Sequence, residues 1–98
     1  ISLDDHKNQI ETILHAAKDK NYETGIVVTS SVTHATPAAF YANVDSRYLE
    51  LEIANQLTDF NIDVVIGGGE RFFLSRLDGG KRDDNLNLIN KIKENGYY

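Results

Sequence analysis

The stretch GIVVT at residues 25–29 decides the fold class, because it is a short run of β-branched residues that follows a polar connector. Apolar side chains on successive positions are typical of a strand that is covered on both faces. A second run of this kind, DVVI at residues 63–66, ends in three glycines. Helical sequence separates the two runs, and a helical crossover joins parallel strands with a right-handed connection. We therefore predict an α/β fold: a βαβ-type segment with parallel strands and flanking helices.

Helical periodicity surrounds both predicted strands. Residues 4–20 carry apolar residues at spacings of three and four, which predicts an amphipathic helix, and Ser2, Asp4 or Asp5 is its predicted N-cap. Residues 46–59 repeat the pattern between the two strands. These helices supply the layers that the strands need for burial.

A polar loop and a short helix are predicted directly after the first strand. Residues 30–36 are rich in hydroxyl groups and lack periodicity, which favours a loop. Thr36 followed by Pro37 is typical of an N-cap and a first helical position. On spacing alone, capping is the simplest role for Thr36.

The end of the chain and the strand edges both indicate a larger sheet. Asp83 or Asp84 is the predicted cap of a last helix that closes at Gly96, and Tyr97 and Tyr98 then resemble the first residues of another strand. Two parallel strands alone leave both edges open, and open edges pair with other strands. We expect residues 1–98 to form a single domain that belongs to a larger body.

Composition excludes several classes of function. The 98 residues carry a net charge of -5, which argues against binding to nucleic acid or to an anionic membrane. There is no cysteine, so disulfide and thiolate chemistry are excluded. The longest run without Asp, Glu, Lys or Arg, residues 24–44, is too polar for a membrane span. No signal peptide is visible at the N-terminus.

Candidate functional residues follow the predicted strands. Ligands of open α/β sheets bind beyond the carboxyl ends of the strands, where a loop with His34 and Thr36 and the glycines at 67–69 are expected. Arg47 is the only Lys or Arg in a long central stretch. It is a candidate anion ligand, because a guanidinium matches two phosphate oxygens at once. The Thr36 hydroxyl is a candidate oxygen ligand for magnesium.

Simpler interpretations of the same residues remain open. His34 in a polar loop is typically a hydrogen-bonded surface group. Arg47 would by default pair with a nearby carboxylate. The acidic residues available for that pairing are Asp45, Glu50 and Glu23.

Other catalytic patterns are absent. The glycines at 67–69 are not a phosphate-binding loop, because no Lys-Ser or Lys-Thr follows, and they indicate a close backbone approach. Ser30 or Ser31 as a nucleophile lacks a partnered base and the required strained turn. His6 and His15 are nine residues apart, which does not place them on one helix face as zinc ligands.

Two stretches together resemble the alkaline phosphatases. Residues 24–47, TGIVVTSSVTHATPAAFYANVDSR, match the family pattern of a Thr-Gly strand, a loop ending in His- or Asp-Ala-Thr-Pro-Ala, a short helix and Ser-Arg. Residues 63–69, DVVIGGG, match a later family motif at the expected distance. Asn43 departs from a histidine that is common at its position. The resemblance covers essentially the whole chain and is closest to the bacterial branch.

The resemblance implies both a fold and a chemistry. It implies that this segment belongs to a larger three-layer α/β/α fold. Alkaline phosphatases hydrolyse phosphate monoesters with two zinc ions, one magnesium ion and a serine that becomes transiently phosphorylated. By this resemblance, Thr36 matches the hydroxyl ligand to magnesium, and Arg47 matches the arginine that holds two oxygens of the phosphoryl group. His34 matches a position beside the magnesium and the phosphate.

The resemblance also implies what the chain lacks. The family's nucleophilic serine and its zinc ligands have no matching motif here, so we expect an internal fragment that is inactive and binds no metal by itself. Family members are typically exported or cell-surface proteins, and the parent enzyme is expected to be a homodimer. The fragment is expected to self-associate through its open strand edges. The alternative is a small non-catalytic α/β module that binds a phosphorylated ligand or a protein.

Overall fold

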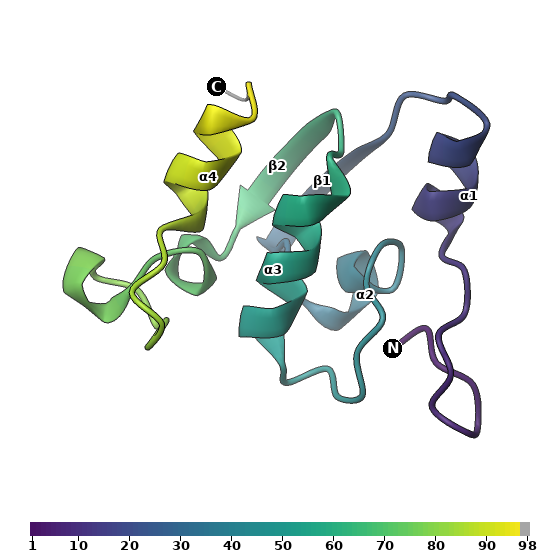
Figure 1. The fold of residues 1–98 in the computed structure, drawn as a ribbon, viewed down its shortest axis with the longest axis horizontal. Helices are drawn as coiled ribbons and strands as arrows, with labels where there is room; N and C mark the ends of the chain where they lie inside the picture. Colours follow the sequence, from purple (N-terminus) through teal and green to yellow (C-terminus); the bar gives the residue numbers. More distant parts are fainter. Residues whose placement is uncertain (97–98) are drawn as a thin grey trace.

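The structure is a computed structural model that describes residues 1–96. The elements in chain order are α1 (Ile13–Asp19), β1 (Gly25–Ser31), α2 (Ala35–Ala38), α3 (Glu50–Phe60), β2 (Val64–Gly68), the 3-10 turns η1 (Glu70–Phe72) and η2 (Arg76–Asp78), and α4 (Leu88–Glu94). β1 and β2 pair in parallel, with α3 in the connection between them (Figure 1). The predicted βαβ arrangement is confirmed. Tyr97 and Tyr98, predicted to begin a strand, lie outside the described residues.

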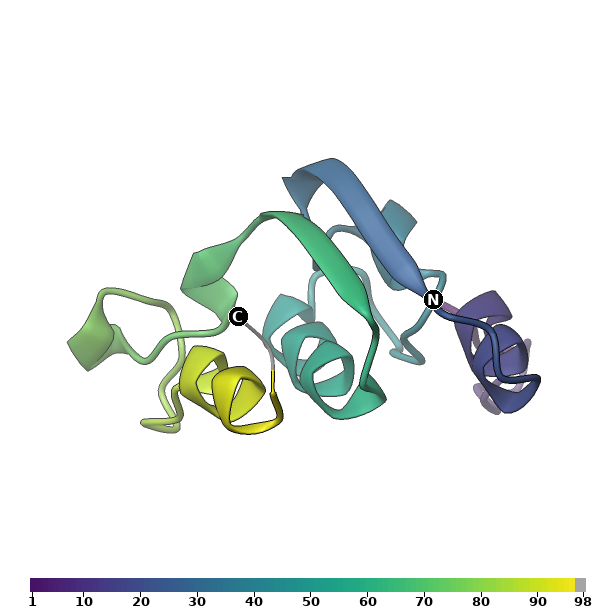
Figure 2. The same cartoon turned by 90° about the horizontal axis from the view of Figure 1, so that it is seen from above.

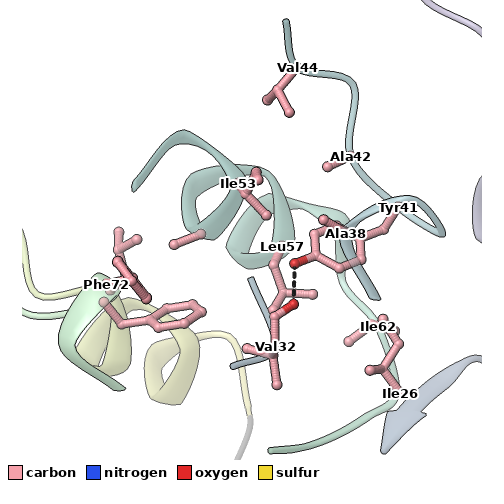
Figure 3. Packing of buried hydrophobic residues seen from close by; sticks show 13 residues of the cluster. Ile26, Val32, Ala38, Tyr41, Ala42, Val44, Ile53, Leu57, Ile62 and Phe72 are labelled. Atoms are coloured by element: carbon pink, nitrogen blue, oxygen red, sulfur yellow. Dashed lines mark hydrogen bonds between the residues drawn. The ribbon is translucent and has the colours of Figure 1, made fainter. Parts of the chain in front are cut away.

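The core lies between the two strands and the helices that cover one face of them. Figure 2 shows α3 and α4 on the same side of the strands, with α1 set apart at the edge. Ile53 and Leu57 of α3 belong to one buried hydrophobic cluster with Ile26 of β1 and with Ile62 (Figure 3). The α1 helix, by contrast, contains no buried residue. Within the described part of the chain, no helix is long and apolar enough to cross a bilayer.

Residues 1–96 cover only one face of the strands. Ile26 is buried, whereas its neighbour Val27 is 71% exposed. Val27 pairs in register with Ile66, which is 58% exposed on the same outer face. The prediction that the first strand is covered on both faces is therefore wrong for this chain. The outer face remains an apolar surface.

The first helix is much shorter than predicted, and its predicted cap is wrong. Thr12 is the N-cap, and its hydroxyl accepts a hydrogen bond from the backbone N–H of His15. Asp4, one of the predicted caps, instead accepts hydrogen bonds from the backbone N–H groups of His6 and Asn8. Short polar side chains compete with helix formation in this way. The residues before Thr12 therefore form a turn at Asp5 and His6 and an isolated bridge between Leu3 and Gln9, rather than the first part of the helix.

The segment after β1 also differs from the prediction. β1 continues through Ser31, and α2 begins at Ala35 with His34 as its N-cap residue. Thr36 lies inside α2, so the prediction that it caps the helix is wrong. Pro37 is tolerated there because the first turn of a helix leaves its N–H groups without intrahelical partners.

The last helix begins later than predicted. Asn87 caps α4, and its side-chain oxygen accepts from the N–H of Asn90 at 3.0 Å. The two predicted caps have other partners, because Asp83 pairs with Arg76 and Asp84 pairs with Arg82. α3 likewise begins at residue 50 rather than 46.

The three glycines lie at the end of β2, where its backbone approaches β1 and the residues after β1 closely, as predicted. A Cβ added to Gly67 would lie 2.6 Å from Val32 Cγ1. Gly69 has φ +95°, and a Cβ added there would lie 2.2 Å from Ser31 Oγ. Both separations are shorter than van der Waals contact, so only glycine fits.

Candidate functional site

Hydrogen bonds fix the turn at residues 32–34, which follows the carboxyl end of β1. The Val32 N–H donates to the Gly68 carbonyl at 3.0 Å, which joins the ends of both strands. The Tyr41 hydroxyl, which is buried, donates to the Val32 carbonyl at 2.7 Å (Figure 3). Burial raises the pKa of the Tyr41 hydroxyl, and the charge of Glu50 adds to this shift. Tyr41 is therefore a neutral donor at any physiological pH.

A second set of contacts, the hydroxyl chain of Ser31, Thr33 and Glu50, holds the next residues. The Thr33 side chain is fully buried, and its Oγ1 donates to Glu50 Oε1 at 3.1 Å. Ser31 Oγ lies 2.6 Å from Thr33 Oγ1 and accepts from the Thr33 N–H at 3.2 Å. This chain connects the end of β1 to the start of α3.

His34 and Thr36 lie beyond these anchors, on the surface. Both side chains are exposed and line a shallow hollow beside β1. Its other lining residues are Val27, Val28, Thr29, Ser30 and Pro37. Neither the imidazole of His34 nor the hydroxyl of Thr36 makes a hydrogen bond to any residue that the structure describes. The two polar groups thus remain available to a ligand.

Arg47 is also exposed and without a carboxylate partner. It lines a second hollow with His34 and Glu50, together with Ala35 and Tyr48. Two of the acidic residues considered for it are engaged elsewhere, since Asp45 pairs with Lys7 Nζ at 3.1 Å and Glu50 accepts from Thr33. Across residues 1–96, Arg47 makes no ion pair. The default pairing of this arginine is therefore not observed.

His34 connects the two hollows. It lines the hollow of Thr36 and also the hollow of Arg47, whereas Thr36 and Arg47 do not line a common one. The structure therefore places all three candidate residues beyond the carboxyl end of β1, with His34 between the other two.

The donors in this region are too few to hold a metal ion by themselves. Among residues 1–96 no group of three or more His, Asp or Glu side chains is placed to hold one. Magnesium prefers octahedral coordination by oxygen, and Thr36 offers one hydroxyl. The residues present fit at most one corner of such a site.

Arg82 has a structural role that the sequence analysis did not identify. Arg82 is 2% exposed. Its guanidinium donates to both carboxylate oxygens of Asp84, to the carbonyls of Leu51 and Phe72, and to Asn55 Oδ1 at 2.8 Å. All five of its N–H groups are used, so Arg82 fastens the segment after β2 to α3. The partners on α3, Leu51 and Asn55, are 31 and 27 residues away in the sequence, so no local pattern indicates them.

The comparison with protein families decides the relationship. The sequence profile of the family described as Alkaline phosphatase matches residues 1–98. The chain belongs to the alkaline phosphatase family. The repressible alkaline phosphatase of Saccharomyces cerevisiae is 37% identical over 99% of this chain and 19% of its own length. Alkaline phosphatase 3 of Bacillus subtilis is 39% identical over 99% of this chain and 21% of its own length.

Solved alkaline phosphatases share the fold of this chain. The enzyme of the Antarctic bacterium TAB5 superposes with a TM-score of 0.87 at 36% identity, covering 100% of this chain and 27% of that enzyme. The Thermus thermophilus enzyme gives a TM-score of 0.91 at 33% identity, covering 100% of this chain and 20% of that enzyme. A histidine-to-glutamate variant of the TAB5 enzyme has Mg bound in its M3 site. The chain spans about a fifth of the length of the curated alkaline phosphatases that it matches.

Proposed function

We propose that this chain is an internal segment of a metal-dependent alkaline phosphatase, and that it binds the phosphoryl group through Arg47. The observation that carries this proposal is the exposed guanidinium of Arg47, which has no ion pair within residues 1–96 and lies next to His34. A guanidinium forms two charge-assisted hydrogen bonds with one phosphate. Such contacts neutralise charge in phosphoryl transfer, which depends mainly on positioning and electrostatics.

The proposal also assigns roles to Thr36 and His34, which line the hollow beside β1. The Thr36 hydroxyl is proposed to donate one oxygen ligand to magnesium, and His34 is proposed to lie beside the metal and the phosphate. The unpartnered state of both side chains supports these roles. Bound metals would neutralise phosphate charge and activate a nucleophile. The serine that becomes phosphorylated and the zinc ligands are proposed to belong to the rest of the enzyme.

The whole enzyme is proposed to hydrolyse phosphate monoesters as an exported or cell-surface homodimer. The family membership supports the reaction class. The dimer and the location rest on resemblance alone. The isolated chain is proposed to be inactive, to bind no metal and to self-associate through its open strand edges.

The first test uses the chain alone. With zinc and magnesium supplied, it should not hydrolyse p-nitrophenyl phosphate, because one hydroxyl does not hold Mg²⁺ against its hydration shell and Arg47 alone binds phosphate weakly. Turnover that purifies with the chain and disappears in Arg47→Ala would overturn the proposed inactivity. Tight, saturable binding of inorganic phosphate by the inactive chain would instead favour a non-catalytic binding module.

The second test uses the complete phosphatase that carries this chain. Arg47→Ala should raise the inhibition constant of inorganic phosphate by about ten- to a hundredfold and lower kcat/KM, because hydrogen bonds between charged groups contribute about 1.5–3 kcal/mol. Arg47→Lys keeps the charge but loses the planar fork, so its effect should be intermediate. Unchanged kinetics and unchanged phosphate inhibition in Arg47→Ala would show that this arginine does not bind the phosphoryl group.

A further inference from the structure

We propose that Glu50 is a positioning residue for the phosphate site. Its hydrogen bond with Thr33 fixes the turn that precedes His34 and Thr36. Glu50 itself begins α3 and lies three residues after Arg47. This inference rests on the proposed function, since it concerns the same site. Its evidence is the hydroxyl chain of Ser31, Thr33 and Glu50.

The direction of each hydrogen bond in this chain follows from chemistry. A carboxylate only accepts, so the single hydroxyl proton of Thr33 goes to Glu50 Oε1. The 2.6 Å contact between Ser31 Oγ and Thr33 Oγ1 must then be donated by Ser31. The Thr33 N–H returns a hydrogen bond to Ser31 Oγ. Every donor in this hydroxyl chain has one acceptor, so the turn has one preferred arrangement.

The burial of Thr33 makes this arrangement costly to leave. Thr33 is fully buried directly before His34, so if Glu50 moved away its hydroxyl could donate only to Ser31 Oγ, and the Ser31 hydroxyl would then lose Thr33 as its acceptor. Ser31 Oγ, at the other end, occupies the space that a side chain at Gly69 would fill, so it lies against the segment that follows β2. The turn is therefore held between β2 and α3.

Glu50 is placed to couple this turn to Arg47. It is the first residue of α3, and its side chain lines the same hollow as Arg47 and His34. Its Oε1 accepts the hydrogen bond from Thr33, and within residues 1–96 its carboxylate forms no ion pair with Arg47. The charge of this carboxylate also raises the pKa of the Tyr41 hydroxyl, which donates a hydrogen bond to the Val32 carbonyl of the same turn. The Glu50 side chain thus fixes the position of His34 relative to Arg47, and the Arg47 guanidinium has no ion pair within residues 1–96.

The experiment compares variants of the complete phosphatase. Thr33→Val and Glu50→Ala should each raise KM and the inhibition constant of phosphate about three- to tenfold, the range that one hydrogen bond supplies. The double variant should be no worse than either single variant, because both remove the same contact. Glu50→Gln and Thr33→Ser keep an acceptor and a donor, so they should stay within about twofold of the unaltered enzyme.

Glu52→Ala is the matched control. Glu52 is also an acidic residue in the first turn of α3, but it accepts from Asn55 and Gln56 rather than from the turn. This variant should leave KM and phosphate inhibition unchanged. If Glu50→Ala and Thr33→Val lower the melting temperature but leave both kinetic quantities unchanged, Glu50 only braces the fold and the proposal is overturned.

A spectroscopic measurement separates this inference from the proposed function. In the same variants, with histidine and arginine labelled with nitrogen-15, the backbone amide signals of His34 and Arg47 should shift together in Glu50→Ala and return in Glu50→Gln. This result is expected even if Arg47→Ala shows that Arg47 does not bind phosphate. An unmoved Arg47 signal would overturn the positioning role whatever the kinetics show.

Discussion

The segment after β1 and the segment after β2 leave the same end of a parallel pair, and each contains an arginine in the opposite situation. Arg82, after β2, is 2% exposed and uses all five of its N–H groups within the protein. Arg47, after β1, is exposed and has no ion pair in the described part of the chain. The first arginine stabilises the fold, whereas the second is the one proposed to bind the phosphoryl group. Burial and available acceptors, rather than residue type, separate an arginine whose N–H groups are all used within the protein from one that makes no ion pair there.

The largest expected effect is the loss of Arg82. Arg82→Ala leaves the carbonyls of Leu51 and Phe72 and the side chain of Asn55 without their donor, so it should lower the free energy of unfolding by about 3 kcal/mol or more. Urea unfolding measures this change. Arg76→Ala is the control.

Arg76 forms an exposed ion pair with Asp83, and such pairs contribute about 0–1 kcal/mol. Equal destabilisation by Arg82→Ala and Arg76→Ala would contradict the contrast between a buried and an exposed arginine.

The next effect tests how the two segments meet at Gly69. Gly69→Ala must adopt a left-handed conformation and also displace Ser31 Oγ, so it should cost about 2–4 kcal/mol of unfolding free energy. Gly79→Ala has the same left-handed requirement at φ +88° with no atom within 4 Å, and it should cost only about 1–2 kcal/mol. Similar values for the two variants would show that β1 and β2 do not approach as closely as described.

A smaller effect concerns pH and the segment after β2. The side-chain hydrogen bond from Arg82 lowers the pKa of Asp84 below its ordinary value of 3.8. Between the two pKa values the unfolded chain binds more protons, so this contribution to stability is present above pH 3.8 and is lost as the pH falls through the lower, folded value. Asp84→Asn should therefore make acid unfolding less steep.

Asp83→Asn removes a charge from the neighbouring residue and is the control for net charge. If Asp84→Asn and Asp83→Asn give the same acid-unfolding curve, the bond to Arg82 is not the source of the pH dependence.

The sequence predicted the parts of this fold that depend on local chemistry. The β-branched runs at 25–29 and 63–66 predicted the parallel strands, because such side chains suit a pleated, buried surface. The glycine motif predicted a close approach for the same kind of reason. Placing Arg47, His34 and Thr36 beyond one strand followed from topology and from resemblance.

Errors arose where a distant or competing partner decides the structure. The predicted first helix begins too early, because Asp4 accepts hydrogen bonds from the nearby N–H groups of His6 and Asn8 instead of capping a helix. The role of Arg82 was missed because its acceptors at Leu51 and Asn55 are far away in the sequence. Such partners become visible only after the chain has folded.

Equilibrium binding of inorganic phosphate to the complete phosphatase, measured by calorimetry, tests the division between the two arginines most directly. Arg47→Ala should weaken binding at least about tenfold while changing the unfolding free energy by no more than about 0.5 kcal/mol. Arg76→Ala, which removes another exposed arginine, should change neither quantity by more than this. Unchanged phosphate affinity in Arg47→Ala, or a loss of stability comparable to that of Arg82→Ala, would contradict the account.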